Sequence, residues 1–153
     1  MKKAKQLLRY PGLVGSSMLA TVFDEFFYGR DLFVRRHGIQ PKYDDAKGFI
    51  DNDDVVISGE SAAEISGIFN GNVAIVSGRS RLATEYSLQP LLHNFNLVAS
   101  VFLEDEEKEV MKNNPNTKIS KPEPYALLKA MKTMNAASAI SVGDSVEDLI
   151  MSR

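Results

Sequence analysis

The sequence predicts an α/β protein with a parallel sheet. The continuous apolar run at 73–76 has the character of a strand that is buried on both faces, and 139–142 is a further predicted strand. Segments with helical periodicity lie between them, and strands that alternate with helices favour a parallel sheet. Each run ends in small polar residues, Ser77-Gly78 and Gly143-Asp144-Ser145. Ligands of such sheets bind outside the carboxyl ends of the strands, so these residues mark a candidate site.

Composition limits the possible functions. The 153 residues suffice for one domain, or for a small domain with an appendage, and 44% hydrophobic with 25% charged residues is typical of globular chains. A net charge of −2 argues against nucleic acid as a partner. The absence of cysteine excludes disulfides, thiolate nucleophiles and cysteine-based zinc sites. No apolar run approaches the roughly 18 residues of a membrane span, and no secretory signal is evident, so we expect a cytoplasmic protein without a membrane partner.

The first predicted unit, residues 1–70, is mainly helical. A broad apolar stripe interrupted at Gly29 predicts a helix over Met18–His37, and Gly38 is a typical helix stop. Apolar residues near helical spacing predict a second helix over Ser61–Phe69. Between the helices the sequence predicts a polar loop and a β-prone run, at Pro41–Gly48 and Val55–Ile57.

The second predicted unit, residues 71–153, alternates strands with helices. After the strand at Val73–Val76, helical periodicity continues to about Leu92. Pro124 suits the first turn of a later helix, which we expect to stop at Asn135. The remaining predicted elements are a strand at Val98–Leu103, a charged loop at Glu104–Glu109, a linker at Pro115–Lys121, a strand at Ala139–Val142 and a helix from Val146.

Each candidate residue has a functional and a structural interpretation. The Ser77 hydroxyl and the Gly78 amide suit a phosphate or carboxylate oxygen, but serine is also a common helix cap. Lys121, just before a helix that opens with proline, can reach an anion or can simply be solvated. Asp144 and Asp148 are spaced to share one helix face, where they suit Mg²⁺ or only stabilise a helix start.

Taken together, these motifs resemble the haloacid dehalogenase superfamily of phosphatases and phosphotransferases. The second motif is matched by "NVAIVS", the third by "KPEP" and the fourth by "GDSVED". The separations, 44 residues from Ser77 to Lys121 and 23 from Lys121 to Asp144, are similar to those of the family. The resemblance covers about residues 72–153, and the "KPEP" and "GDSVED" pair looks like the phosphoglycolate-phosphatase-like subfamily. It implies a Rossmann-like core at 71–153 and a helical cap at 1–70.

The resemblance also implies roles for the candidate residues. Ser77 and Gly78 would bind a phosphoryl oxygen, and Lys121 would bridge the nucleophile and the phosphoryl group. Asp144 would hold Mg²⁺ and Asp148 would support the metal shell. The implied substrate is a small phosphorylated metabolite, and Arg79 and Arg81 could contact its anion or lie solvated on the surface.

The nucleophilic motif, Asp-x-Asp after a buried strand, has one near match, Asp51-Asn52-Asp53. The residues before it make a poor strand, and an acidic surface loop is the alternative. We therefore expect a partial chain of a longer phosphatase, without its own nucleophile. A second hypothesis is an inactive fragment that acts by association with a partner chain or a second copy. A nucleotide-binding module ranks lower, because the glycines form no dinucleotide or Walker pattern.

Overall fold

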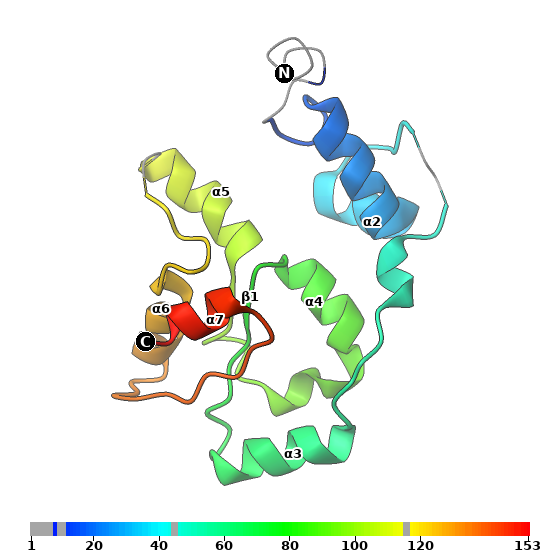
Figure 1. Ribbon diagram of the computed structural model, residues 1–153. Coiled ribbons are helices and arrows are strands. Elements are labelled where there is room, and N and C mark those ends of the chain that lie inside the picture. The colour runs from blue at the N-terminus through cyan, green and yellow to red at the C-terminus, as the bar shows by residue number, and fades with distance from the viewer. Residues whose placement is uncertain (1–7, 9–11, 44–45, 115–116) are drawn as a thin grey trace. The chain divides into compact units, whose positions relative to one another are not determined.

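The computed structural model describes residue 8 and residues 12–43, 46–114 and 117–153. The chain divides into two compact units that meet between Asp54 and Val55. The sequence predicts this boundary after residue 70, whereas the structure places it after Asp54. The second predicted helix therefore belongs to the second unit. The described elements of the chain are mostly helices, with one small parallel sheet (Figure 1). None of the helices described is both long and apolar enough to cross a membrane.

The first unit is built on α2, which spans Met18–His37 as predicted. Ser17 caps its start by accepting a hydrogen bond from the amide of Ala20. Gly38 ends it in the left-handed conformation, with φ 69°, and donates its N–H to the carbonyl of Val34. Local capping residues therefore set both ends of this helix.

Gly29 divides α2 into two helical pieces. Its backbone has φ 64° and ψ 173°, which lies outside the helical region. At this break Gly29 forms an antiparallel bridge with Lys47, and the amide of Arg30 donates to the carbonyl of Ala46. A short 3-10 helix, η1 (Phe49–Asn52), follows. The interruption that the sequence shows at Gly29 is thus the point where the returning chain meets the helix.

The second unit contains the sheet. β1 (Val76–Ser77) pairs in parallel with β2 (Val101–Phe102), with Val76 opposite Val101. The core formed by Val101, Leu103, Ile119, Ala126 and Ala130 packs beside the strands. The helices are α3 (Gly59–Ile68), α4 (Arg81–Leu88), the 3-10 helix η2 (Gln89–Asn94), α5 (Leu103–Asn113), α6 (Tyr125–Thr133) and α7 (Val146–Met151).

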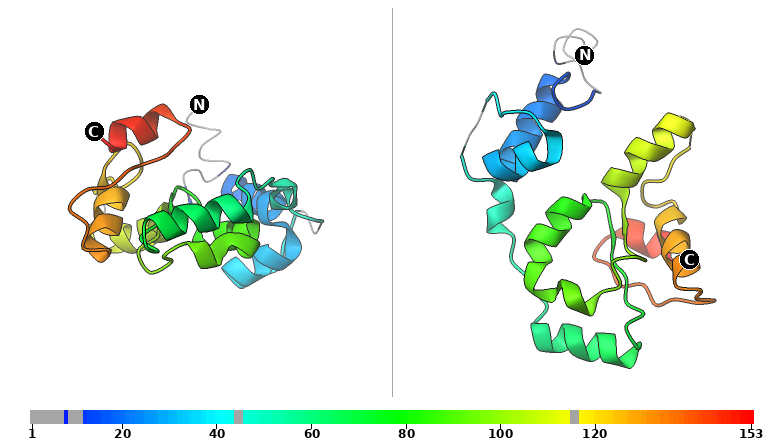
Figure 2. Two further views of the ribbon diagram at one scale, coloured as in Figure 1. Left: turned by 90° about the horizontal axis from the view of Figure 1, so that it is seen from below. Right: turned by 180° about the vertical axis from the view of Figure 1, so that it is seen from behind.

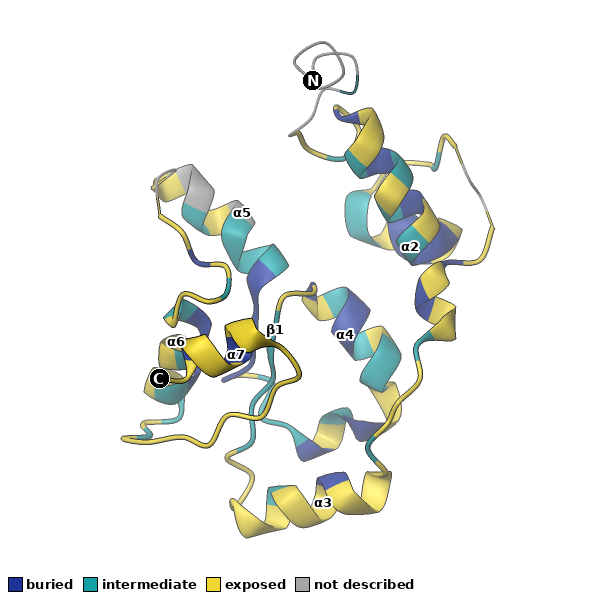
Figure 3. Ribbon diagram, viewed as in Figure 1, coloured by how far each residue is buried: buried dark blue, intermediate teal, exposed yellow. Residues whose placement is uncertain are grey.

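The helices differ in how far this unit buries them. α6 lies against both strands, as the view from behind in Figure 2 shows. α3 is exposed along most of its length, whereas α5 begins in the buried core (Figure 3). The predicted helix after Pro124 is confirmed. It ends close to the predicted stop, where Asn135 adopts φ 52°.

The predicted strand at Ala139–Val142 is wrong. The segment has no regular structure, and Ile140 and Val142 are 79% and 95% exposed. A strand needs a neighbour for its backbone hydrogen bonds. Within the described residues only β1 and β2 pair as strands, so this run lacks a partner.

Several other elements also differ from the sequence-based prediction. The charged segment Glu104–Glu109 is not a loop but lies within α5, because three acidic residues in its first turn complement the positive end of the helix dipole. Val55–Ile57 forms no strand. The strand predicted at 73–76 is observed only at Val76–Ser77, and the strand predicted at 98–103 shortens to Val101–Phe102. The α/β class with parallel pairing is correct, on a smaller sheet than expected.

Candidate functional site

Lys121 and Asp148 lie in direct contact. Lys121 sits in the turn before α6, and Asp148 lies in the first turn of α7. The distance from Lys121 Nζ to Asp148 Oδ1 is 2.5 Å, although the two residues are 27 positions apart in the chain. Their side chains are only 20% and 11% exposed. The fold has therefore joined residues of two separate sequence motifs in one shielded ion pair.

The second carboxylate oxygen of Asp148, Oδ2, is hydrogen-bonded as well. Oδ2 accepts hydrogen bonds from the Ser145 hydroxyl at 2.6 Å and the Ser145 amide at 3.2 Å. The Ser145 hydroxyl in turn accepts from the amide of Asp148, which completes a capping box at the start of α7. The Lys121 ammonium and then the Ser145 hydroxyl lower the pKa of the Asp148 carboxyl, and together they outweigh the effect of burial.

This ion pair leads to a pH-dependent prediction. Because folding lowers the pKa of Asp148, its stabilising contribution is present above the unfolded value of about 3.8 and disappears as pH falls through the folded value. We expect wild type to unfold at higher denaturant concentration than Asp148→Asn at pH 7, with the difference shrinking below about pH 4. Urea titrations across this range test it, and a difference independent of pH would contradict the assignment.

Asp144 differs from Asp148 in being exposed on the loop before α7. Within the part of the chain that the structure describes, no three histidine or acidic side chains gather into a group that could hold a metal. Both Asp148 oxygens already accept hydrogen bonds, whereas Asp144 is an exposed residue. The metal roles of Asp144 and Asp148 stay predictions.

Ser77 and Gly78 follow β1, as the sequence indicates. Ser77 is a half-buried residue, and its hydroxyl accepts a hydrogen bond from the amide of Arg79 at 3.1 Å. The helix cap is a different serine, Ser80, whose buried hydroxyl accepts from the amide of Ala83. Gly78 is exposed, with open space where a Cβ would lie. The substrate-binding roles of Ser77 and Gly78 also stay predictions.

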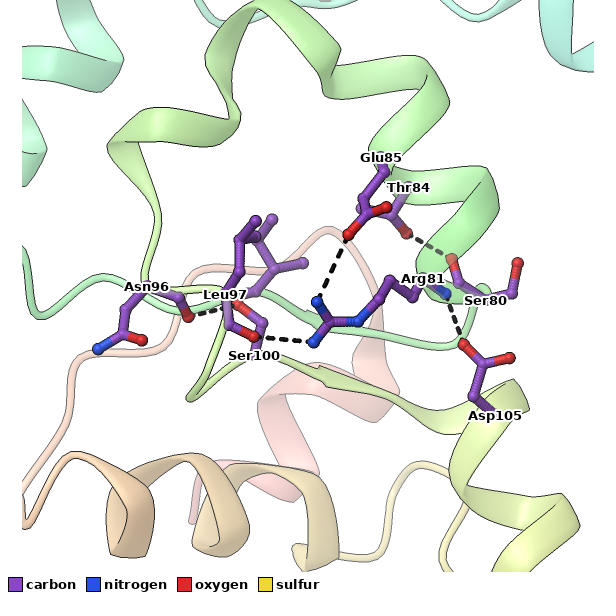
Figure 4. Close-up of polar contacts among 9 residues, drawn as sticks. Ser80, Arg81, Thr84, Glu85, Asn96, Leu97, Ser100 and Asp105 are labelled. Atoms are coloured by element: carbon purple, nitrogen blue, oxygen red, sulfur yellow. Dashed lines mark hydrogen bonds and ion pairs between the residues drawn. The ribbon is translucent and has the colours of Figure 1, made fainter.

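The Arg81 side chain connects the start of α4 to the turn that precedes β2 (Figure 4). Its Nη2 donates to the carbonyl of Leu97 at 2.9 Å, and its Nη1 lies 3.4 Å from Glu85. The guanidinium also lies over the ring of Phe102, 5.0 Å from its centre. Its amide donates to Asp105 at 2.7 Å, a contact the sequence did not reveal. These contacts favour a structural role for Arg81 over substrate binding.

Asp51 and Asp53 belong to the first unit. Asp51 lies in η1 and Asp53 directly follows it, and no strand precedes them in the described residues. A nucleophilic aspartate of the predicted kind comes directly after a buried strand. In the described residues, Asp51 and Asp53 do not have this position. The structure thus favours the acidic-surface interpretation, with Asp51 exposed.

The first unit also holds a pocket of about 450 Å³ that the sequence did not reveal. Glu25 lines it with a fully buried side chain and accepts from the amides of Lys42 and Tyr43 at 2.7 and 2.6 Å. Thr21 accepts from the amide of Gly15 and donates to the carbonyl of Ser17. The Glu25 contacts join α2 to the chain that follows it, and the Thr21 contacts join α2 to the residues that precede it, so these polar groups have structural partners.

No family model, no curated protein and no solved structure gives a significant match to this chain. The candidate site is therefore argued from its own residues. The contact that combines two motifs, Lys121 with Asp148, is its best-supported part.

Proposed function

We propose that this chain contributes to Mg²⁺-dependent hydrolysis of a phosphate monoester of a small metabolite, as a haloacid-dehalogenase-like phosphatase with a Rossmann-like core. The observation that carries the proposal is the Lys121–Asp148 contact. It supports the proposal because phosphoryl transfer depends mainly on positioned positive charge, and a shielded, oriented ammonium is such a charge.

Lys121 would neutralise charge on the transferring phosphoryl group. One of its three N–H bonds is directed to Asp148, which leaves donors for a nucleophile or a phosphoryl oxygen. Asp148 keeps the ammonium in place and would itself stay ionised at neutral pH, because its pKa is lowered. Ser77 and the Gly78 amide would add neutral hydrogen bonds to the same group.

The residues present would supply part of a Mg²⁺ coordination shell. Mg²⁺ commonly takes one or two carboxylates and completes its shell with water and substrate phosphate. Asp144 supplies an exposed carboxylate for this purpose, and Asp148 lies in the next turn. When bound, Mg²⁺ would reduce the negative charge on phosphoryl oxygens.

The nucleophile would come from outside the described site. The proposed reaction needs an aspartate that attacks phosphorus, forms an aspartyl phosphate and releases the alcohol, after which water hydrolyses the acyl phosphate. Since no strand precedes Asp51 and Asp53 in the part of the chain that the structure describes, we expect this aspartate on an additional strand ending in Asp-x-Asp.

The test compares two forms of the protein. We expect the 153-residue chain to hydrolyse no p-nitrophenyl phosphate in Mg²⁺, and a chain extended by the upstream coding sequence to hydrolyse it. Hydrolysis by the short chain that disappears in Asp51→Asn would identify Asp51 as the nucleophile instead. Absence of an Asp-x-Asp strand upstream, together with inactivity of both forms, would overturn the hydrolase proposal.

A second candidate is an inactive chain that acts by association. The observation that favours it is the exposure of Ile140 and Val142, which are 79% and 95% exposed in a segment that pairs with no strand in the described residues. Unpaired β-prone segments of this kind promote pairing with another chain. Sedimentation at increasing concentration tests it: association that Ile140→Lys abolishes would support it, and a monomer at all concentrations would contradict pairing with a second copy.

A further inference from the structure

Gly143 approaches Asp148 more closely than a residue with a side chain could. A Cβ placed on Gly143 would lie 2.5 Å from Cγ and 2.6 Å from Oδ2 of Asp148. These distances are far below van der Waals contact. The φ angle of Gly143 lies outside the left-handed region. Glycine is therefore required here for space and not for its backbone conformation.

Asp148 cannot easily move to make room. Oδ1 is bound by Lys121, Oδ2 is bound by Ser145, and the residue is 8% exposed. Its amide is held by the Ser145 hydroxyl at the same time. A methyl group on Gly143 would therefore displace either the carboxylate or the turn between residues 143 and 145.

We infer that Gly143 is a positioning residue for Lys121, because it leaves the space in which the Asp148 carboxylate sits and orients the ammonium. A lysine ammonium on its flexible four-carbon stem needs such an anchor to occupy one position. The benefit to phosphoryl transfer rests on the proposed function, whereas the steric coupling from Gly143 through Asp148 to Lys121 does not.

Selective labelling of lysines in the full chain tests the coupling. Reductive methylation requires access of the reagent to the amine, and the Lys121 side chain is only 20% exposed while it is bound to Asp148. We expect Gly143→Ala to increase the methylation rate of Lys121 severalfold, measured by peptide mass spectrometry. Lys129 is the internal reference, because it is held by both carboxylate oxygens of Glu106 at 2.6 Å. Gly67→Ala, where a Cβ meets nothing within 4 Å, is the matched control. An unchanged Lys121 rate in Gly143→Ala would overturn the inference.

A double-mutant cycle keeps the inference testable if Gly143→Ala folds poorly. Asp148→Gly removes the three heavy atoms that lie nearest to the new methyl group, Cβ, Cγ and Oδ2 of Asp148. We expect Gly143→Ala to lower Tm in the wild-type background and to have little effect in the Asp148→Gly background. An equal loss in both backgrounds would show that another neighbour explains the glycine. Neither measurement uses a substrate. A negative result would therefore overturn the role of Gly143 and leave the hydrolase proposal standing, and a failure of the hydrolase proposal would leave the role of Gly143 standing.

Discussion

Lys121→Ala is expected to lower turnover on the order of 10²-fold or more in the form of the protein that hydrolyses a phosphate monoester. The variant removes the charge that would stabilise the transferring group, and it also removes one hydrogen-bond partner of Asp148 while Ser145 remains. Initial rates with one substrate, at saturating Mg²⁺, measure the effect. Because transition-state charge is lost, kcat should fall more than KM rises.

The control variants separate this role from a general loss of positive charge. Lys129→Ala removes a lysine that binds Glu106 on the surface, and its activity should match wild type. Asp144→Asn should raise the Mg²⁺ requirement, with partial recovery at high Mg²⁺. Ser77→Ala should be milder, because it deletes one neutral hydrogen bond. If Lys121→Ala behaves like wild type, the assignment of Lys121 is wrong.

Gly48→Ala is expected to destabilise the first unit by about 2–3 kcal/mol through overpacking. A Cβ on Gly48 would lie 2.5 Å from the nitrogen of Gly29 and 2.6 Å from the carbonyl oxygen of Phe27. Both are backbone atoms at the break in α2, so no side chain can rotate away to relieve the clash. Hydrogen exchange of the α2 amides measures the loss within this unit.

Gly67→Ala provides the comparison for this substitution as well. Gly67 lies inside α3 with no heavy atom near its Cβ position, so alanine should stabilise the helix by up to about 1 kcal/mol. The two substitutions add the same methyl group and are expected to act in opposite directions. Normal exchange protection of α2 in Gly48→Ala would contradict the close packing of Gly48 against Gly29.

The sequence by itself determined where several of the helices lie. The apolar stripe and Gly38 predicted the bounds of α2, because each helical hydrogen bond spans only four residues and the end groups are satisfied nearby. The same reasoning placed the helix after Pro124 and the helix from Val146. The candidate residues Lys121 and Asp148 were also identified from the sequence, but their contact was not.

Only the tertiary structure decided what depends on distant partners. Ala139–Val142 has the apolar character of a buried strand, yet it stays exposed because strand hydrogen bonds need a neighbouring chain segment. The 2.5 Å contact between Lys121 and Asp148 and the close approach of Gly48 to Gly29 likewise arise from chain segments that meet after folding. A local pattern carries no information about which remote backbone or side chain will lie within a few ångströms, and that proximity positions the ammonium of the candidate site.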